Sequence, residues 1–257
     1  MDIKKAAAQL LEAEQTKVPI APLTELYPEI NEDDAYAIQL EVIQQKVSAG
    51  AKIVGKKIGL TSKAMQNLVG VDEPDYGHIL DNMLFMQGDT ISLDKYIEPK
   101  VEFELGFILN KDLDGPDVTV IDVIQATDYI VPAFEIIDSR IEDWKIKYED
   151  TVADNGSSAG ALISTQFSKI DGIDLGNIGM TVHKNGELFD TGSTGAILGN
   201  PLNCVVWLAN SLLKYGVKLK AGELILAGAV TAATPVEPGD SFTMLFDHLG
   251  QTTIKFV

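Results

Sequence analysis

The chain has 257 residues, which is long enough to bury a full hydrophobic core, and it carries 20 lysines and arginines against 38 aspartates and glutamates. The net charge of -18 repels phosphate backbones and anionic lipids, so neither nucleic acid nor a membrane is an expected partner. No window approaches the roughly 20 uninterrupted apolar residues of a membrane span, and the first residues lack the apolar core of a signal peptide, so the sequence predicts a cytoplasmic protein.

The first fifty residues predict helices. Residues 3–15 are rich in alanine, leucine and glutamate, which favour a helix. A second helix is expected after Asn31, a good N-cap residue that is followed by three acidic side chains at the positive end of the helix. It should end at Gly50. These helices predict a small N-terminal cap.

After Gly50 the hydrophobic pattern changes to the two-residue period of a strand, over residues 53–60. Lys57 shares one face of this strand with Gly55 and Gly59, which have no side chains, so a ligand could approach the backbone there and meet the ammonium group. Taken alone, the segment is more typical of a lysine that is exposed to water.

Residues 72–77 contain the turn formers of an ordered loop. The loop includes Asp75, and a carboxylate is ordinary in such a segment. The spacing therefore gives Asp75 no special role.

Residues 99–109 predict a strand with two carboxylates on one face. Glu102 and Glu104 alternate with large apolar residues, so both are aimed at the same half-buried surface. Like charges repel, and burying either one unpaired costs several kcal/mol, so such a strand needs a cation. A bound divalent metal provides one. An edge strand with a wet polar face is equally compatible with the spacing alone.

The next strand, residues 129–137, carries one charge, Glu135, in a nearly continuous apolar run. An ionised glutamate there needs a positive partner, which a metal held by Glu102 and Glu104 would supply. Because the set has three glutamates and no histidine, the expected ion is a hard cation with oxygen ligands, Mg²⁺ or Mn²⁺. Pro132 indicates an edge strand or a bulge at this point.

The rest of the chain predicts a loop, a hairpin and a helix. Residues 150–158 are small and polar, and they form either a plain loop or a cradle for a substrate carboxylate. Asn185 and Gly186 suit the turn of a hairpin, and a helix begins at Pro201. Cys204 lies in that helix. As the single cysteine it excludes an internal disulfide and a cysteine-based zinc site, and core packing is its expected role.

Five motifs occur in order along the chain, at residues 55–62, 72–77, 99–104, 132–140 and 152–155. Together they are similar to the motifs of the 2-keto-4-pentenoate hydratase and 4-oxalocrotonate decarboxylase family, which belongs to the fumarylacetoacetate hydrolase superfamily. The resemblance runs from about residue 38 to residue 257. The order and spacing of several motifs make it more specific than any one of them.

The resemblance implies an α+β fold, with a mixed β-roll core of the fumarylacetoacetate hydrolase type and a small helical N-terminal region. Residues 1–75 would form the N-terminal helical cap region and residues 76–257 the catalytic β-roll domain. It also implies a homo-oligomer, which could associate with the sister hydratase or decarboxylase, because such association is known in the family.

The resemblance further implies a site that binds a 2-hydroxy-2,4-dienoate, or its 2-oxo tautomer. Water would add at C4 to give a 4-hydroxy-2-oxoacid, as in aromatic meta-cleavage catabolism, with Lys57 and Asp75 as the proton-transfer and water-orienting groups. The implied ligands of Mg²⁺, or of Mn²⁺, are Glu102, Glu104 and Glu135. The expected substrate-binding residues are Asp154, Asn155, Ser157 and Thr231.

Two features of the sequence favour different reactions. Asp75 and residues 139–144 are more like the hydratases, whereas residues 231–240 resemble the decarboxylases. Asp75 carries more weight, because water addition needs a proton-transfer group that loss of CO₂ can do without. A hydratase is therefore expected, with a decarboxylase as the alternative. A non-catalytic partner subunit is a third reading, which the intact charged set disfavours, since a scaffold has no reason to keep buried charges.

Overall fold

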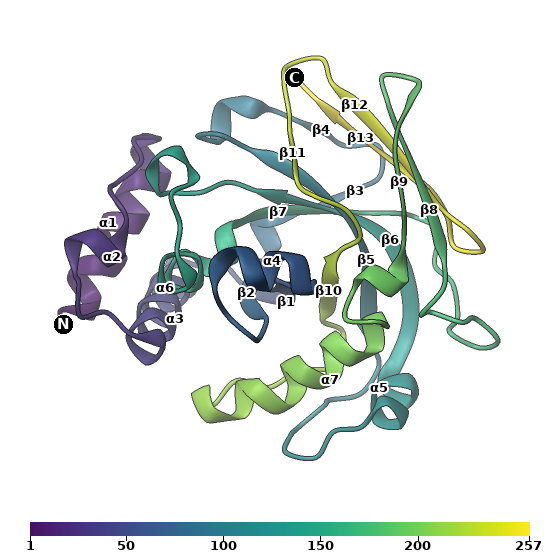
Figure 1. Ribbon diagram of the computed structural model, residues 1–257, viewed down its shortest axis with the longest axis horizontal. Helices are drawn as coiled ribbons and strands as arrows, with labels where there is room; N and C mark the ends of the chain where they lie inside the picture. Colours follow the sequence, from purple (N-terminus) through teal and green to yellow (C-terminus); the bar gives the residue numbers. More distant parts are fainter.

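The computed structural model describes the backbone of residues 1–257 and the side chains of residues 1–67 and 70–257. Its helices are α1 (Ile3–Thr16), α2 (Leu23–Leu26), α3 (Glu32–Ser48), α4 (Lys63–Val69), α5 (Val120–Ala126), α6 (Tyr148–Ala153) and α7 (Pro201–Ser211). Helices α1, α2, α3 and α6 gather at one end of the molecule (Figure 1). The two helices predicted in the first fifty residues are confirmed as α1 and α3, and the Asn31 side chain caps α3 by accepting the N–H of Asp34.

Two sheets form the rest of the fold. The large sheet contains, in spatial order, β2 (Asp75–Leu80), β1 (Ile53–Gly59), β10 (Leu224–Ala229), β5 (Lys100–Leu109), β6 (Thr127–Ile137), β7 (Ser158–Ile163) and β3 (Leu84–Met86), with β11 (Thr234–Pro235) paired to β5. The small sheet contains β4 (Thr90–Ile91), β13 (Gly250–Phe256), β12 (Ser241–Phe246), β8 (Gly179–Lys184) and β9 (Glu187–Ser193). Parallel and antiparallel pairs occur in both, so the predicted mixed α+β architecture is confirmed.

The two faces of β5 have different surroundings. Phe103 packs against Phe134 of β6 and Phe242 of β12, with ring centroids 5.9 Å apart in both pairs, and all three rings are buried. This face of β5 therefore lies on the small sheet and forms part of the core. Glu102 and Glu104 lie on the opposite face, as the alternation along the strand predicts.

The first 75 residues contain more than helices. Strand β1 pairs in parallel with β10 and antiparallel with β2, so it lies inside the large sheet. Helices cover most of residues 3–48 and return in α4 after β1, and the segment that carries Lys57 is hydrogen-bonded into the large sheet between them.

Pro132 does not mark an edge strand or a bulge, because β6 lies between β5 and β7 and pairs regularly there, with Leu105 opposite Pro132. The prediction was wrong for a local reason. The Pro132 carbonyl accepts the N–H of Ser164, one residue beyond the end of β7. The Pro132 nitrogen faces the same side, past the end of that strand, so its missing N–H removes no hydrogen bond between the two strands.

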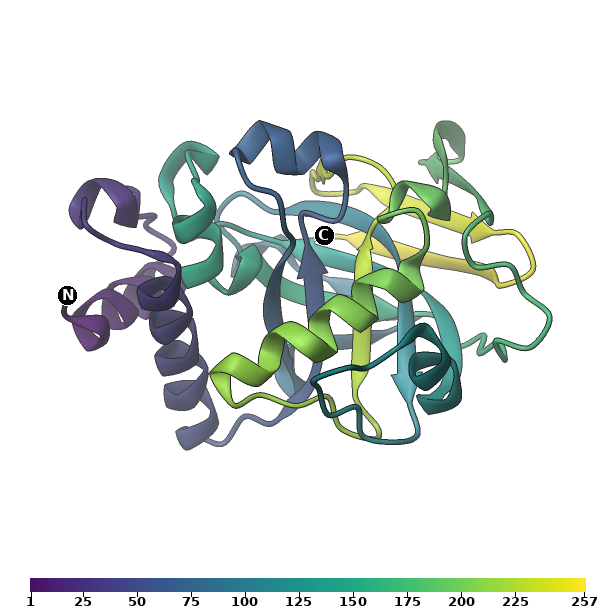
Figure 2. The ribbon, with the colours of Figure 1, turned by 60° about the horizontal axis from the view of Figure 1, so that its bottom comes forward.

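Helix α7 lies across the large sheet over β10 (Figure 2). It belongs to the 22-residue segment Thr194–Tyr215, which contains an 18-residue window with a mean hydropathy of 1.3. Length and composition alone would allow such a segment to cross a membrane, as they do for many core helices. In the structure, α7 buries Leu202, Val205 and Leu208. Cys204 is buried beside them, which agrees with its expected role in packing.

Candidate active site

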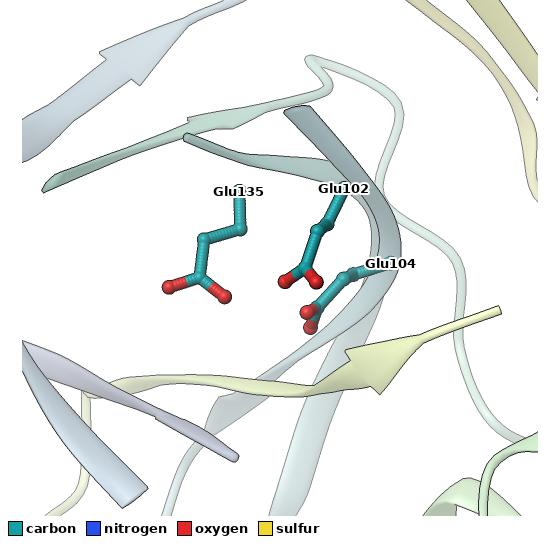
Figure 3. Close-up of side chains that lie close together, drawn as sticks. All are labelled: Glu102, Glu104 and Glu135. Carbon is teal, nitrogen blue, oxygen red and sulfur yellow. The ribbon is translucent and has the colours of Figure 1, made fainter. Parts of the chain in front are cut away.

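Three glutamates converge on one face of the large sheet. The antiparallel register of β5 and β6 places Glu102 opposite Glu135, and Glu104 follows two residues later on the same face of β5. One carboxylate oxygen from each lies within 4.8 Å of the others. Figure 3 shows the three carboxylates pointing into the same space. Glu104 and Glu135 are fully buried, so an edge strand with a wet polar face is ruled out.

The glutamates lack partners that would satisfy them. Glu104 Oε2 accepts the N–H of Gly228 at 2.8 Å, but Glu104 Oε1 and both oxygens of Glu135 have no hydrogen-bond partner among the described residues. Glu135 Oε2 lies 3.4 Å from Lys57 Nζ, which is an ion-pair contact rather than a well-formed hydrogen bond. Buried acceptors without donors need an explanation, and a divalent cation with oxygen ligands fits this set.

Burial has a large effect on these carboxyl groups. It raises the pKa of Glu135 to about 7, although the ammonium group of Lys57 lowers it, and it also raises the pKa of Glu102. The pKa of Glu104 lies well above its usual range because burial and the charges of Glu135 and Glu102 all act in the same direction. A bound cation would favour the charged carboxylates instead, so the site is built for a positive ion.

Lys57 lies beside this cluster. The residue is 3% exposed, so the reading of Lys57 as a solvated lysine is wrong. Nζ donates a hydrogen bond to the carbonyl oxygen of Gly156 at 2.9 Å. Burial alone would lower the pKa of Lys57, but the carboxylates of Glu135 and Asp75 outweigh it and raise this pKa, which favours the ammonium form.

Asp75 is the first residue of β2 and not part of a loop. It pairs opposite Gly59, and Thr151 Oγ1 donates to Asp75 Oδ2 at 3.1 Å. The other oxygen, Oδ1, is buried and has no hydrogen-bond partner among the described residues. A Cβ atom on Gly59 would collide with Asp75 Oδ1 and come within 3.2 Å of Lys57 Nζ. Asp75 and Lys57 therefore share the space that Gly59 leaves open.

Three of the residues expected to bind substrate have side chains that make hydrogen bonds or an ion pair with other residues of the chain. Asp154 forms a buried ion pair with Arg140. Asn155 Oδ1 accepts the N–H of His78 at 2.7 Å, and Asn155 Nδ2 donates to the carbonyl of His78 at 2.9 Å. Ser157 Oγ lies 3.5 Å from Asp154 Oδ2. The short turn that they form presents the Gly156 carbonyl to Lys57.

Thr231 lies in the loop between β10 and β11. Its Oγ1 is buried without a hydrogen-bond partner among the described residues, and its Cγ2 lies beside Gly192 of the small sheet. The structure thus brings Lys57, Asp75 and the three glutamates together and shows no such placement for Thr231.

Sequence reasoning missed Thr151 and Gly156. Thr151 is 76 residues from Asp75, and Gly156 is 99 residues from Lys57. The only available signal was that both lie in the polar segment 150–158. No periodicity connects such a segment with a distant strand.

Comparison with known proteins gives one family. The sequence model described as "Fumarylacetoacetate (FAA) hydrolase C-terminal" matches residues 58–257. A 2-keto-4-pentenoate hydratase from Paraburkholderia xenovorans is 47% identical over 253 residues, which cover 98% of this chain and 94% of the relative. A 2-hydroxyhexa-2,4-dienoate hydratase from Comamonas testosteroni is 41% identical over 256 residues, covering 99% and 97%.

Solved structures show the same fold. The 4-oxalocrotonate decarboxylase from Pseudomonas putida G7, complexed with magnesium and adipate, has a TM-score of 0.96 and 37% identity, covering 99% of this chain and 97% of that one. A fumarylpyruvate hydrolase from Pseudomonas aeruginosa, in complex with Mn²⁺ and pyruvate, has a TM-score of 0.62 and 15% identity, covering 79% and 88%. At that identity the likeness concerns the fold alone, and the predicted fold type is confirmed.

Proposed function

Since the chain belongs to the fumarylacetoacetate hydrolase family, we propose that it is a magnesium-dependent hydratase of a 2-hydroxy-2,4-dienoate. The product is a 4-hydroxy-2-oxoacid, as in aromatic meta-cleavage catabolism. One observation carries the proposal: Asp75 Oδ1 is buried and unpaired among the described residues, and it shares the gap over Gly59 with Lys57 Nζ. The hydratases that resemble this chain along nearly its whole length support the same reaction.

Glu102, Glu104 and Glu135 would hold the cation, Mg²⁺ or Mn²⁺, because their oxygens converge and several lack other partners. When bound, the cation supplies positive charge that stabilises the negative charge developing on the C2 oxygen of the substrate.

In this proposal, Asp75 acts on water. Thr151 fixes Oδ2 by donating a hydrogen bond to it, which leaves Oδ1 free to hold the attacking water and receive its proton. Lys57 would hold a proton at Nζ, and the support for this role is that Nζ donates a hydrogen bond to the carbonyl of Gly156 beside the glutamates. In the balanced reaction the C2 hydroxyl loses a proton and C5 gains one. The water then contributes its hydroxyl group to C4 and a proton to C3.

The test is a direct assay of the protein with Mg²⁺ and 2-hydroxypenta-2,4-dienoate, with products identified by mass spectrometry. We expect a product heavier than the substrate by one water. A parallel assay with 2-oxohex-3-enedioate detects loss of CO₂. If neither substrate is converted at saturating Mg²⁺, the proposal is wrong.

A decarboxylase is the second candidate. The observation in its favour is the TM-score of 0.96 with the 4-oxalocrotonate decarboxylase, together with the likeness of residues 231–240 to decarboxylases. Conversion of the enedioate with CO₂ release, and no hydration of the pentadienoate, would establish this reading instead.

We also propose a homo-oligomer that acts in the cytoplasm and can associate with the sister decarboxylase. Its support is an apolar patch on α5, where Val120, Ile121 and Ile124 are 36%, 65% and 38% exposed. Sedimentation at micromolar concentration should give a mass above the 27.8 kDa of one chain. A mass equal to one chain would contradict the proposal.

A further inference from the structure

We propose that Asn155 is a positioning residue that places the ammonium group of Lys57 through the carbonyl of Gly156. The sequence suggested a substrate-binding role for Asn155. In the structure, both polar atoms of its amide are bonded to the backbone of His78. The amide therefore supports the backbone around the site rather than a ligand. The expected effect on kcat rests on the proposed function.

The turn that carries Asn155 needs such a support. Asn155, Gly156 and Ser157 have φ angles of 58°, 59° and 55°, so three successive residues lie in the left-handed region. Only Gly156 adopts this conformation without a steric penalty. A run of this kind persists only where the surroundings hold it, and it is often found at functional sites.

Asn155 ties the turn to the strand beside Lys57. His78 follows Gly77, and Gly77 pairs opposite Lys57 between β2 and β1. A Cβ atom on Gly77 would collide with the Asn155 carbonyl, so turn and strand are in close contact. Gly156, the next residue of the turn, receives the hydrogen bond of Lys57 Nζ at 2.9 Å. The amide of Asn155 is thus one residue removed from the group that orients the ammonium ion.

Two further sets of contacts hold the backbone before this turn. Gln39 of α3 donates from Nε2 to the carbonyl of Tyr76 at 2.9 Å and to that of Val152 at 2.7 Å, which joins β2 to α6. The ion pair between Arg140 and Asp154 fixes the start of the turn. The far end is held by the N–H of Asp138, which donates to the carbonyl of Ser157 at 2.8 Å. Between these fixed ends, the amide of Asn155 sets the position of the Gly156 carbonyl.

The test compares two matched variants, Asn155→Gly and Asn185→Gly. Glycine keeps the left-handed conformation available and removes only the side chain. Asn185 is the matched control, because its φ is 54° and its amide also makes two bonds, accepting the N–H of Ser241 at 2.8 Å and donating to Asp240 at 3.1 Å, at the hairpin of the small sheet.

We expect Asn155→Gly to lower kcat for the dienoate about 10- to 100-fold, the size of effect that misplacement of a reacting group produces. KM and the Mg²⁺ affinity measured by calorimetry should stay within about twofold, since the variant removes neither the carboxylates of the site nor the charge of Lys57. Asn185→Gly should leave kcat unchanged. A rise in KM alone would mean that Asn155 binds substrate, and equal losses in both variants would mean a general structural role. Either result overturns the inference.

A second measurement is independent of activity. Reductive methylation with formaldehyde, followed by mass spectrometry, gives the rate of labelling of Lys57 relative to Lys56, which is also buried but paired with Glu223 on the other face of β1. Asn155→Gly should raise this ratio, and an unchanged ratio contradicts the inference even if the protein proves not to be a hydratase. If Asn155→Gly does not fold, Asn155→Asp carries the test, because it keeps the acceptor for His78 and replaces only the donor.

Discussion

Lys56 and Lys57 are neighbours on β1, and both are buried, but their surroundings differ. Lys56 Nζ donates to both oxygens of Glu223, at 2.8 and 2.7 Å, on the face of the sheet away from the candidate site. Lys57 Nζ has one carbonyl partner and a looser contact of 3.4 Å with Glu135. One lysine has a complete, local ion pair, and the other faces several carboxylates that it cannot satisfy alone.

The pKa directions follow the same division. Burial lowers the pKa of Lys56 even though Glu223 raises it, because a single carboxylate opposes the desolvation. The pKa of Lys57 is raised in spite of burial, because Glu135, Asp75, Glu102 and Glu104 all favour the ammonium form. A buried charge with a matched partner needs nothing from outside the chain, whereas a surplus of unpaired charge marks a place for something that the chain does not itself provide.

The largest effect is expected at the carboxylate that faces Lys57. Glu135→Gln should abolish metal-dependent activity while the protein stays folded, because it removes ligand charge from a site whose glutamates otherwise repel one another. Calorimetry should show loss of Mg²⁺ or Mn²⁺ binding, and circular dichroism should show a folded chain. Unchanged affinity would remove Glu135 from the site.

The next effect concerns Asp75, on the same face as Lys57. Asp75→Asn should lower the rate of dienoate hydration by about 10² to 10⁴, the usual range for loss of a general acid–base group, with little change in Mg²⁺ affinity. Release of CO₂ from 2-oxohex-3-enedioate should survive the change if that activity is present. Hydration at the wild-type rate would show that Asp75 does not transfer the proton, and would remove the main reason for preferring a hydratase.

The sequence predicted the three glutamates better than the backbone contacts that surround them. Alternation along residues 99–109 placed Glu102 and Glu104 on one face, and the lone charge in residues 129–137 singled out Glu135. The register that sets Glu102 opposite Glu135 is not a property of either strand alone. The sequence connected them only through the positive partner that Glu135 needed and through the family resemblance.

Contacts between distant segments account for the rest. The bonds from Asn155 to His78 join residues 77 apart, so the sequence could not show that this amide is bonded to the backbone. Pro132 was read as an edge signal because the sequence does not show that β7 ends beside it. The fold class followed from local patterns and resemblance, but the assignment of polar side chains to substrate or to backbone required the structure.

The two lysines themselves give a paired test. Lys57→Met should lower turnover strongly at saturating Mg²⁺ and leave the folded state intact. Lys56→Met should leave activity per folded molecule unchanged and lower the free energy of unfolding by about 3 kcal/mol, because it leaves Glu223 buried without its partner. Denaturant unfolding and steady-state kinetics on both variants measure the two effects. If both variants lose activity alike, the two faces of β1 do not have separate roles.

The smallest effect should appear at His78, which lies on the Lys56 face of β2. Its Nδ1 is 3.2 Å from Gln39 Oε1, and burial together with the charge of Lys56 lowers the pKa of His78 from 6.5 to about 3. Between these two pKa values, the imidazole of His78 binds a proton in the unfolded chain but not in the folded chain. The free energy of unfolding therefore decreases as the pH falls below 6.5.

For this one group, the loss between about pH 7.5 and about pH 5 amounts to about 2 kcal/mol in the free energy of unfolding. His78→Gln keeps an N–H donor near Gln39 but has no charge to gain, so its stability should fall less over the same range. His248→Gln, at an exposed position, is the control and should behave as the wild type. If wild type and His78→Gln lose stability equally, His78 is not the group that makes the Lys56 face sensitive to acid.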